Sequence, residues 1–202
     1  MNLFEYSGRK ESLSSSPLST RMRPKSLDEF IGQEHILGKG KALYNLVENK
    51  TIPSMIFWGG PGTGKTTLAK IIAQKSNMNF RSLSAVSSGL ADIRKISDEV
   101  IFQRSTSSKK TILFLDEIHR FSKSQQDSLL PLIEEGILIL IGATTEHPGF
   151  SIINPLISRV KIFKFNPHNE ESINIILNKT IRNKEEFFSD SDIIIEEDVI
   201  KI

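Results

Sequence analysis

The sequence contains no cysteine, and this absence removes several classes of function at once. Without thiols there is no disulfide framework, no thiolate metal site and no cysteine nucleophile. An excess of charge of one sign is also lacking, because 26 Lys and Arg residues face 24 Asp and Glu residues for a formal net charge of +2. A nearly neutral chain has no global field that attracts nucleic acid or anionic membranes, so any such binding must come from a local patch.

Long apolar runs are missing as well. No segment approaches the length that spans a bilayer, and the N-terminus has no apolar stretch behind a basic start. We therefore expect a soluble, cytoplasmic protein that is neither exported nor bound to a membrane. The Ser-rich residues 7–20 show no hydrophobic period, and we expect residues 1–20 to be poorly ordered.

Short apolar runs alternate with amphipathic segments along the rest of the chain. Strands are predicted at residues 54–58, 80–84, 111–117, 137–145 and 160–165. Helices are predicted around residues 43–47, 66–75 and 91–103, from Ser124, and at residues 169–181. Nearly continuous apolar strands are typical of a parallel sheet that helices cover on both faces. The sequence therefore predicts a three-layer α/β domain over residues 21–166, followed by the beginning of a helical lid over residues 167–202.

The sequence GGPGTGKT, residues 59–66, separates the first of these strands from its helix and fits the pattern G-x-x-x-x-G-K-[ST]. Such glycines let successive N–H groups point at phosphate oxygens, and the following helix adds its N-terminal dipole. Lys65 is expected to reach the β and γ phosphates, and Thr66 to place its hydroxyl on Mg²⁺. The loop predicts that ATP binds together with Mg²⁺. The predicted nucleotide-binding residues of this segment are Gly59, Gly60, Pro61, Gly62, Thr63, Gly64, Lys65, Thr66 and Thr67.

The strand at residues 111–117 ends in two acids. Asp116 is predicted to hold the Mg²⁺, directly or through a water, and Glu117 to act as the base that polarises an attacking water. Acids also end strands near solvent without any catalytic role. Because this pair accompanies a phosphate loop, the catalytic interpretation is favoured.

The same segment spells D-E-x-H from Asp116 to His119, as in helicases built from two RecA-like domains. Too few residues follow His119 for a second such domain, and the two motifs lie too close together in the sequence. His119 also has no metal partner at helical spacing. We therefore interpret it as a surface or sheet-end residue rather than a metal ligand.

Two further residues extend the predicted site. The apolar run IGATT, residues 141–145, turns polar where parallel strands gather their carboxyl ends, which places Thr145 near the γ phosphate. A threonine that only caps the strand end is the alternative. Arg159 follows a short helix just before the last predicted strand, and by itself would be a surface charge.

Taken together, these segments resemble the AAA+ ATPases in order and spacing. The resemblance rests on RMRPKSLDEFIGQEHIL, the phosphate loop, ILFLDEIHRFSKSQQDSLLPLIEEG, LIGATTEHPGF and NPLISR, and covers about residues 21–159. More narrowly, the chain resembles the N-terminal ATPase core of the RarA/MgsA family, the replication-associated recombination proteins related to clamp loaders and to the Holliday-junction motor. DEIHRF followed by SQQDSLLP and GATTE is specific to this branch.

The resemblance implies further roles. Thr145 matches sensor 1, and Arg159 matches the arginine finger that acts in the neighbouring subunit's site. Pro24 and the segment Ile31-Gly32-Gln33 match the N-terminal box that lies against adenine. The family also implies a homo-oligomer, single-stranded, forked or gapped DNA as a partner, and room for other replication proteins. Family members continue for about twice this length through a lid and an oligomerisation domain, so the chain is either a fragment or a shortened product.

The function implied is an ATPase core that acts on DNA in replication-fork maintenance and recombination. A catalytically weak nucleotide-binding module without its lid, and a clamp-loader or branch-migration subunit, are the alternatives. One departure from the family is Gly60, where proline is usual, which leaves the loop freer but its N–H groups intact. Residues 82–89, flanked by Arg81 and Arg94, would face DNA in a ring. We favour a simpler interpretation, a strand-to-helix connection with serines for capping.

Overall fold

The computed structural model describes residues 17–182, except for the side chain of Ser105. The predictions that concern residues 1–16 and 183–202, parts of the expected lead-in and lid, lie outside the described residues. The chain divides into two compact units. The larger unit is Gln33–Pro167, and the smaller joins Met1–Gly32 with His168–Ile202. The domain boundaries predicted from the sequence stay predictions.

A single parallel sheet forms the centre of the larger unit. Its strands are β1 (Met55–Trp58), β2 (Asn79–Ser84), β3 (Thr111–Asp116), β4 (Ile139–Thr144) and β5 (Lys161–Lys164). Their order across the sheet is β2-β3-β4-β1-β5, and every neighbouring pair is parallel. The middle of β3 is almost fully buried, as expected for a strand covered on both faces. The predicted parallel sheet is confirmed.

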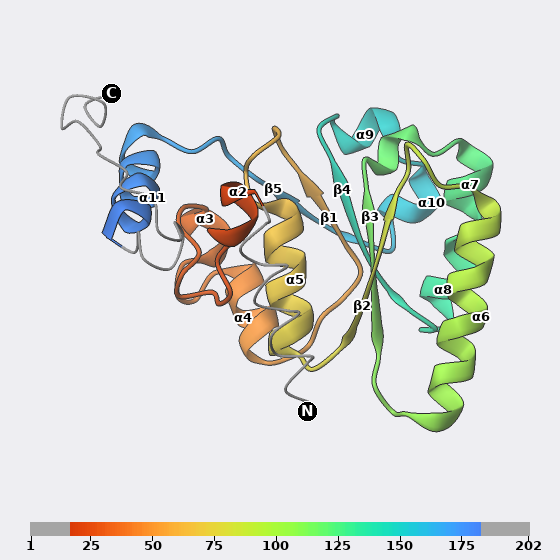
Figure 1. The fold of residues 1–202 in the computed structure, drawn as a ribbon. Helices are drawn as coiled ribbons and strands as arrows, with labels where there is room; N and C mark the ends of the chain where they lie inside the picture. Colours follow the sequence, from red (N-terminus) through yellow and green to blue (C-terminus); the bar gives the residue numbers. More distant parts are fainter. Residues whose placement is uncertain (1–16, 183–202) are drawn as a thin grey trace. The chain divides into compact units, whose positions relative to one another are not determined.

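Helices cover both faces of the sheet, which gives the three predicted layers (Figure 1). One face carries α3 (Glu34–Leu37), α4 (Ala42–Glu48) and α5 (Lys65–Lys75). The other carries α6 (Leu90–Thr106), α7 (Lys123–Asp127), α8 (Leu130–Glu134) and α10 (Asn154–Ile157). The short α9 (Pro148–Ser151) follows β4, and the 3-10 turn η1 (Ile118–Arg120) follows β3.

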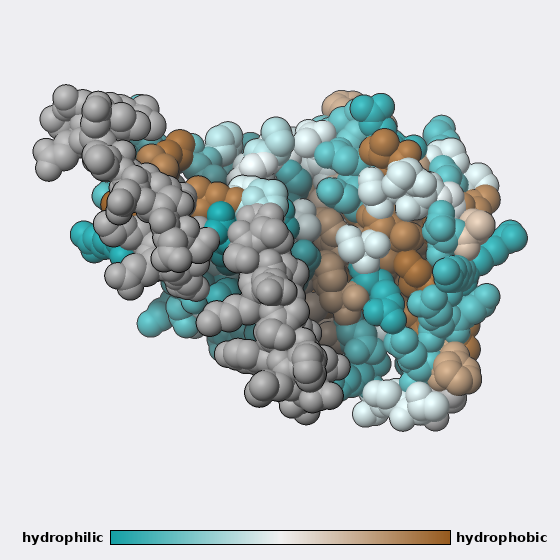
Figure 2. Space-filling model, viewed as in Figure 1, coloured by the Kyte–Doolittle hydropathy of each residue, from teal (hydrophilic) through white to brown (hydrophobic). Residues whose placement is uncertain are grey.

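The amphipathic pattern of the helices explains this packing. α5 buries Leu68, Ile71 and Ile72, the apolar face that its sequence predicts. On the opposite face, Ile93 and Val100 of α6 belong to a core that also contains residues of β1, β3 and β4. Figure 2 shows hydrophobic residues where α6 faces the strands and mostly hydrophilic residues on its outer side, although Ile101 and Phe102 of α6 are exposed. Burial of apolar surface on both faces thus stabilises the three layers.

The parallel register brings the carboxyl ends of the strands to one edge. Trp58 at the end of β1 is paired with Thr144 of β4 and with Lys164 of β5. At the other side of the sheet, Asp116 at the end of β3 is paired with Ser84 of β2. The loops that follow β1, β3 and β4 therefore start from the same edge, where ligands of open α/β sheets bind.

The smaller unit contains two described helices, α2 (Leu18–Arg21) and α11 (Glu170–Arg182). The helix predicted at residues 169–181 is thus confirmed. Thr180 of α11 donates a hydrogen bond to the Ile176 carbonyl, and its hydroxyl lies 3.4 Å from the Met22 sulfur. Segments far apart in the sequence therefore pack together in this unit.

Candidate nucleotide-binding site

The phosphate loop connects β1 to α5, as its sequence predicts. Gly62 and Gly64 have φ angles of +74° and +94°, in the left-handed region that glycine enters without steric cost. The Thr63 hydroxyl donates a 2.9 Å hydrogen bond back to the Gly60 carbonyl. A Cβ atom placed on Gly60 or Gly62 would meet nothing within 4 Å. The loop is therefore curved, tied across its base and open on its outer side.

Gly59, the first residue of the loop, has a different reason to be glycine. A Cβ atom there would lie 2.4 Å from the Phe165 carbonyl oxygen, which belongs to the chain leaving β5. The Gly59 N–H also donates a hydrogen bond to the Thr144 carbonyl at 3.1 Å. Close passage of two backbones thus fixes where the loop leaves the sheet.

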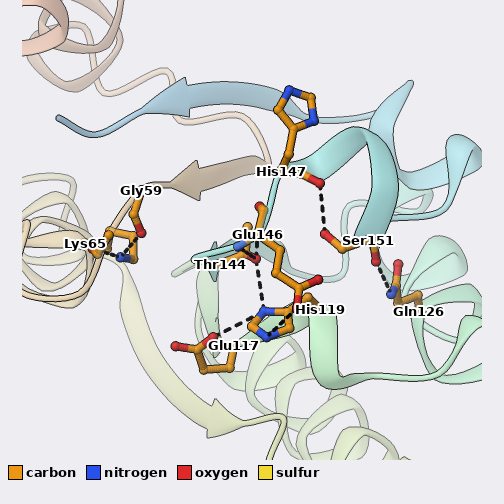
Figure 3. Close-up of polar contacts among 10 residues, drawn as sticks. Gly59, Lys65, Glu117, His119, Gln126, Thr144, Glu146, His147 and Ser151 are labelled. Atoms are coloured by element: carbon orange, nitrogen blue, oxygen red, sulfur yellow. Dashed lines mark hydrogen bonds and ion pairs between the residues drawn. The ribbon is translucent and has the colours of Figure 1, made fainter.

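Lys65 brings a positive charge into the loop. Its ammonium donates hydrogen bonds to the Gly59 carbonyl at 2.7 Å and to the Gly60 carbonyl at 2.6 Å (Figure 3). Burial lowers the pKa of Lys65, and the negative charges of Glu117 and Asp116 partly offset this effect. Because both hydrogen-bond partners are neutral carbonyls, the buried charge favours an anion in the loop.

The start of α5 offers the same kind of ligand a second attraction. Gly64 is the N-cap, and no side chain accepts the first N–H groups of this helix. Unsatisfied N–H groups at a helix N-terminus carry partial positive charge and bind phosphate or carboxylate oxygens. Thr66 and Thr67 lie in this first turn and are partly exposed. The loop, the ammonium and the helix therefore fit a polyphosphate.

Asp116 and Glu117 follow each other at the end of β3, and both are partly exposed. Glu117 has a φ of +54°, which is uncommon for a residue with a side chain. This left-handed residue ends the strand and reverses the chain into η1. The two carboxyls thus stand at the strand edge, close enough to Lys65 for their charges to affect its pKa.

His119, in η1, was interpreted from the sequence as a surface or sheet-end residue. It lies at the end of the sheet, but its side chain is only 5% exposed, so the surface alternative is wrong. Its Nδ1 lies 3.0 Å from the Thr144 hydroxyl and 3.2 Å from Glu117 Oε2. Figure 3 shows the ring between Glu117, Thr144 and Glu146, which come from two strand ends. The sharp turn at Glu117 brings this about, because it folds η1 back against β4.

The two threonines that end the IGATT run have different environments. Thr144 is fully buried, and its hydroxyl accepts the Glu146 N–H at 3.0 Å besides its contact with His119. Thr145 is the next residue and is exposed. The contact of Thr145 with the γ phosphate, predicted from the sequence, stays a prediction.

Arg159 follows α10 directly and is 39% exposed through its side chain. Its guanidinium donates to the Pro155 carbonyl at 2.8 Å and to the Ser158 hydroxyl at 3.0 Å, and it pairs with Glu134 of α8. None of these partners belongs to the phosphate loop of the same chain. The predicted role of Arg159 in a neighbouring subunit's site stays a prediction.

The N-terminal box is divided between the two units. Pro24 and Ile31 belong to the smaller unit, and their predicted contact with adenine stays a prediction. Gln33 belongs to the larger unit, where its buried amide donates to the Asn166 carbonyl at 2.7 Å and accepts the Asn166 N–H at 2.9 Å. Gln33 therefore ties the start of this unit to the segment after β5. Sequence reasoning had no signal for this pair, since 133 positions separate its members.

The connection after β2 has a simple structural explanation. Arg81 lies 3.7 Å from the Glu99 carboxylate, and α6 begins after Gly89. The cap of α6 comes from Asp92, which accepts the Gly89 N–H at 2.8 Å, so the expectation that a serine caps this helix is wrong. Within the described residues, no helix is long and apolar enough to cross a membrane.

Comparisons with known proteins show which family the chain belongs to. The model of the ATPase family associated with various cellular activities (AAA) matches residues 55–167. Replication-associated recombination protein A of Haemophilus influenzae is 44% identical over 92% of this chain and 42% of the relative. ATPase WRNIP1 of Dictyostelium discoideum is 45% identical over 99% of this chain and 23% of the relative. The chain therefore spans less than half the length of either curated relative, and the resemblance predicted from the sequence is confirmed.

Solved structures give the same result for the fold. The Thermotoga maritima RuvB Holliday junction branch migration motor superposes with a TM-score of 0.68 at 31% sequence identity. This superposition covers 82% of this chain and 55% of the motor chain. The five-stranded parallel sheet thus belongs to a fold that is known from solved structures.

Proposed function

Because the chain belongs to the AAA family of ATPases, we propose that it binds ATP with Mg²⁺ and hydrolyses it to ADP and phosphate. The observation that carries this proposal is the phosphate loop around Lys65. There, a buried ammonium has only neutral carbonyls as hydrogen-bond partners, and an uncapped helix N-terminus lies beside it. A triphosphate supplies the negative charge that both features lack.

The residues around the loop divide the binding task. Backbone N–H groups of residues 62–66 and the Lys65 ammonium bind the β and γ phosphates, and Thr67 supports the first turn of α5. Thr66, through its hydroxyl, and Asp116, through its carboxylate, hold the Mg²⁺, which prefers such oxygen ligands. When bound, this ion neutralises charge on the β and γ phosphate oxygens. Pro24 and Ile31 contact the adenine base.

Glu117 acts as the base in the hydrolysis. Its carboxylate accepts a proton from a water whose oxygen bonds to the γ phosphorus. The bond between that phosphorus and the bridging oxygen breaks, and ADP leaves with the electron pair. Thr145 contacts the γ phosphate at the end of β4, and Arg159 stabilises the developing charge in the neighbouring copy's site.

The DNA part of the proposal rests on the relatives. One relative is named replication-associated recombination protein A, and another is named ATPase WRNIP1. A structural neighbour is a Holliday junction branch migration motor. We propose that this chain is the ATPase core of a homo-oligomer that acts on single-stranded, forked or gapped DNA in replication-fork maintenance and recombination. The nearly balanced charge means that DNA contacts are local ones.

The main alternative is a nucleotide-binding module with little turnover. The observation that favours it is the arrangement of Arg159. Its guanidinium binds Pro155, Ser158 and Glu134 of its own chain, and none of these residues belongs to the phosphate loop. A site that needs an arginine from a neighbouring copy hydrolyses poorly when the chain is alone.

Phosphate release tests both versions. In the full-length protein, we expect hydrolysis that single-stranded or gapped DNA stimulates, less so at high salt because DNA contacts are salt-dependent. Glu117→Gln should still bind ATP but not turn it over. Hydrolysis that DNA leaves unchanged would refute the DNA part. Vigorous hydrolysis by the isolated 202-residue chain would refute the alternative.

A further inference from the structure

His119 is a buried polar residue that the proposed mechanism does not use. It lies in η1, two residues after the proposed base Glu117, and its side chain is 5% exposed. One ring nitrogen, Nδ1, lies close to both the Glu117 carboxylate and the Thr144 hydroxyl. The other, Nε2, lies 3.6 Å from Glu146 Oε1. The ring therefore connects the end of β3 with the end of β4.

The neighbours of Nδ1 determine where the ring carries its proton. An ionised carboxylate has only lone pairs, and Glu117 Oε2, 3.2 Å from Nδ1, lies closer than Glu146 Oε1, 3.6 Å from Nε2, so we assign the ring hydrogen to Nδ1. The Thr144 hydroxyl is then an acceptor for this N–H at 3.0 Å, and it donates its own hydrogen to the Glu146 carbonyl at 3.3 Å. The Thr144 hydroxyl then has partners for both its hydrogen and its lone pairs, which supports the assignment of the proton to Nδ1.

This single N–H has two competing acceptors. Its hydrogen bond goes to Thr144, while the Glu117 carboxylate lies to its side at a comparable distance. Thr144 is the last residue of β4, and the next residue is Thr145, the proposed γ-phosphate contact. The shared N–H thus lies between the proposed base and the strand end that leads to Thr145.

We propose that His119 is a positioning residue: its Nδ1–H, hydrogen-bonded to Thr144, attracts the Glu117 carboxylate 3.2 Å away and couples the base to the phosphate-facing end of β4. This inference rests on the proposed function, in which Glu117 activates water. Glu117 is 35% exposed through its side chain, so without the ring its carboxylate has freedom to rotate into solvent. His119 does not touch the substrate. It acts by keeping the base where water is attacked.

Two other histidines of the larger unit supply an internal contrast. His147 Nδ1 accepts the Gly149 N–H at 3.1 Å, so its ring proton must be on Nε2. His35 Nε2 lies 2.8 Å from the Lys164 carbonyl, which only accepts, so this ring also carries its proton on Nε2. The structure therefore predicts opposite tautomers for His119 and for these two residues.

Nuclear magnetic resonance of the histidine side chains tests this prediction on the 202-residue chain without any turnover. Long-range nitrogen–proton spectra distinguish the two tautomers, and the signal lost in His119→Asn identifies this ring. We expect a proton on Nδ1 of His119, and a proton on Nε2 with a bare Nδ1 for His147. A bare Nδ1 in His119 would overturn the inference, because no N–H would then face Glu117.

Turnover of the full-length protein tests the role itself. His119→Leu removes the N–H, and we expect kcat to fall by about tenfold or more while the KM for ATP stays unchanged. His119→Asn keeps an N–H near the position of Nδ1 and should restore part of kcat.

The outcomes separate the two proposals. If Glu117→Gln is inactive while His119→Leu keeps the wild-type kcat, the His119 inference fails and the proposed function stands. The same conclusion follows if His119→Leu and His119→Asn lower kcat equally, because the N–H would then not matter. If Glu117→Gln hydrolyses ATP as the wild type does, the base assignment fails first and takes the inference with it.

Discussion

Replacement of Lys65 by alanine is the most direct test of the nucleotide site. The ammonium now donates to two loop carbonyls, at 2.7 and 2.6 Å, which shows that two of its donor directions point into the loop. A hydrogen bond that involves a charged group contributes about 1.5–3 kcal/mol. Two such bonds to phosphate oxygens, at the lower end of this range, contribute about 3 kcal/mol, so Lys65→Ala should weaken ATP binding by about a hundredfold.

The chain contains its own reporter for this measurement. Trp58 is the only tryptophan of the sequence and directly precedes Gly59, the first residue of the loop. Its ring contacts His147 at a centroid distance of 4.6 Å and has the Lys164 ammonium 5.4 Å from its centroid. We expect its fluorescence to change when ATP and Mg²⁺ are added. Titration calorimetry gives the same dissociation constant independently of the signal.

A matched variant controls for the loss of one positive charge on α5, the helix that begins at Lys65. Lys70 lies on the same helix, but its side chain is exposed. Lys70→Ala should bind ATP as the wild type does, because the charge of an exposed side chain is screened by solvent and salt. If Lys65→Ala and Lys70→Ala bind ATP equally well, the assignment of the phosphate loop is refuted.

Three further predictions concern the same edge of the sheet. Gly59→Ala should lower the free energy of unfolding in urea by about 1–3 kcal/mol, because its Cβ meets the Phe165 carbonyl, whereas Gly60→Ala should not. Without nucleotide, the free energy of unfolding of the wild type should rise with pH, and Lys65→Met should lose part of this rise. Because burial lowers the pKa of Lys65 in the folded chain, the folded chain binds fewer protons than the unfolded chain below pH 10.5. Denaturation at several pH values detects the difference. Arg159→Ala should lower DNA-stimulated kcat by about a thousandfold without a change in ATP affinity, and a retained kcat would contradict its role between subunits.

Much of the architecture could be predicted because it depends on local patterns. The strands β1, β3 and β4 are compact apolar runs, and their separation by amphipathic helices is enough to indicate a parallel sheet. The order β2-β3-β4-β1-β5 was not among the predictions. Strand order depends on which distant segments pair, and no single segment of the sequence contains that information.

His119 shows where local reasoning reached its limit. Its position after two acids suggested a surface or sheet-end residue, and no periodic pattern marked it as buried. Its burial follows from the left-handed turn at Glu117 and from the approach of β4, which lies 25 positions further along the chain at Thr144. A prediction of this contact would have required both the backbone conformation of one residue and the neighbour of its strand.

The sequence by itself determined the phosphate loop, because its function depends on glycines and one lysine that are adjacent in the chain and take their shape from local backbone preferences. Tertiary structure alone decided which distant residues contact one another. Gly59 passes the Phe165 carbonyl, Gln33 binds Asn166, and Arg159 pairs with Glu134. These contacts join residues that lie far apart in sequence, and only packing of the sheet and its helices brings them within bonding distance.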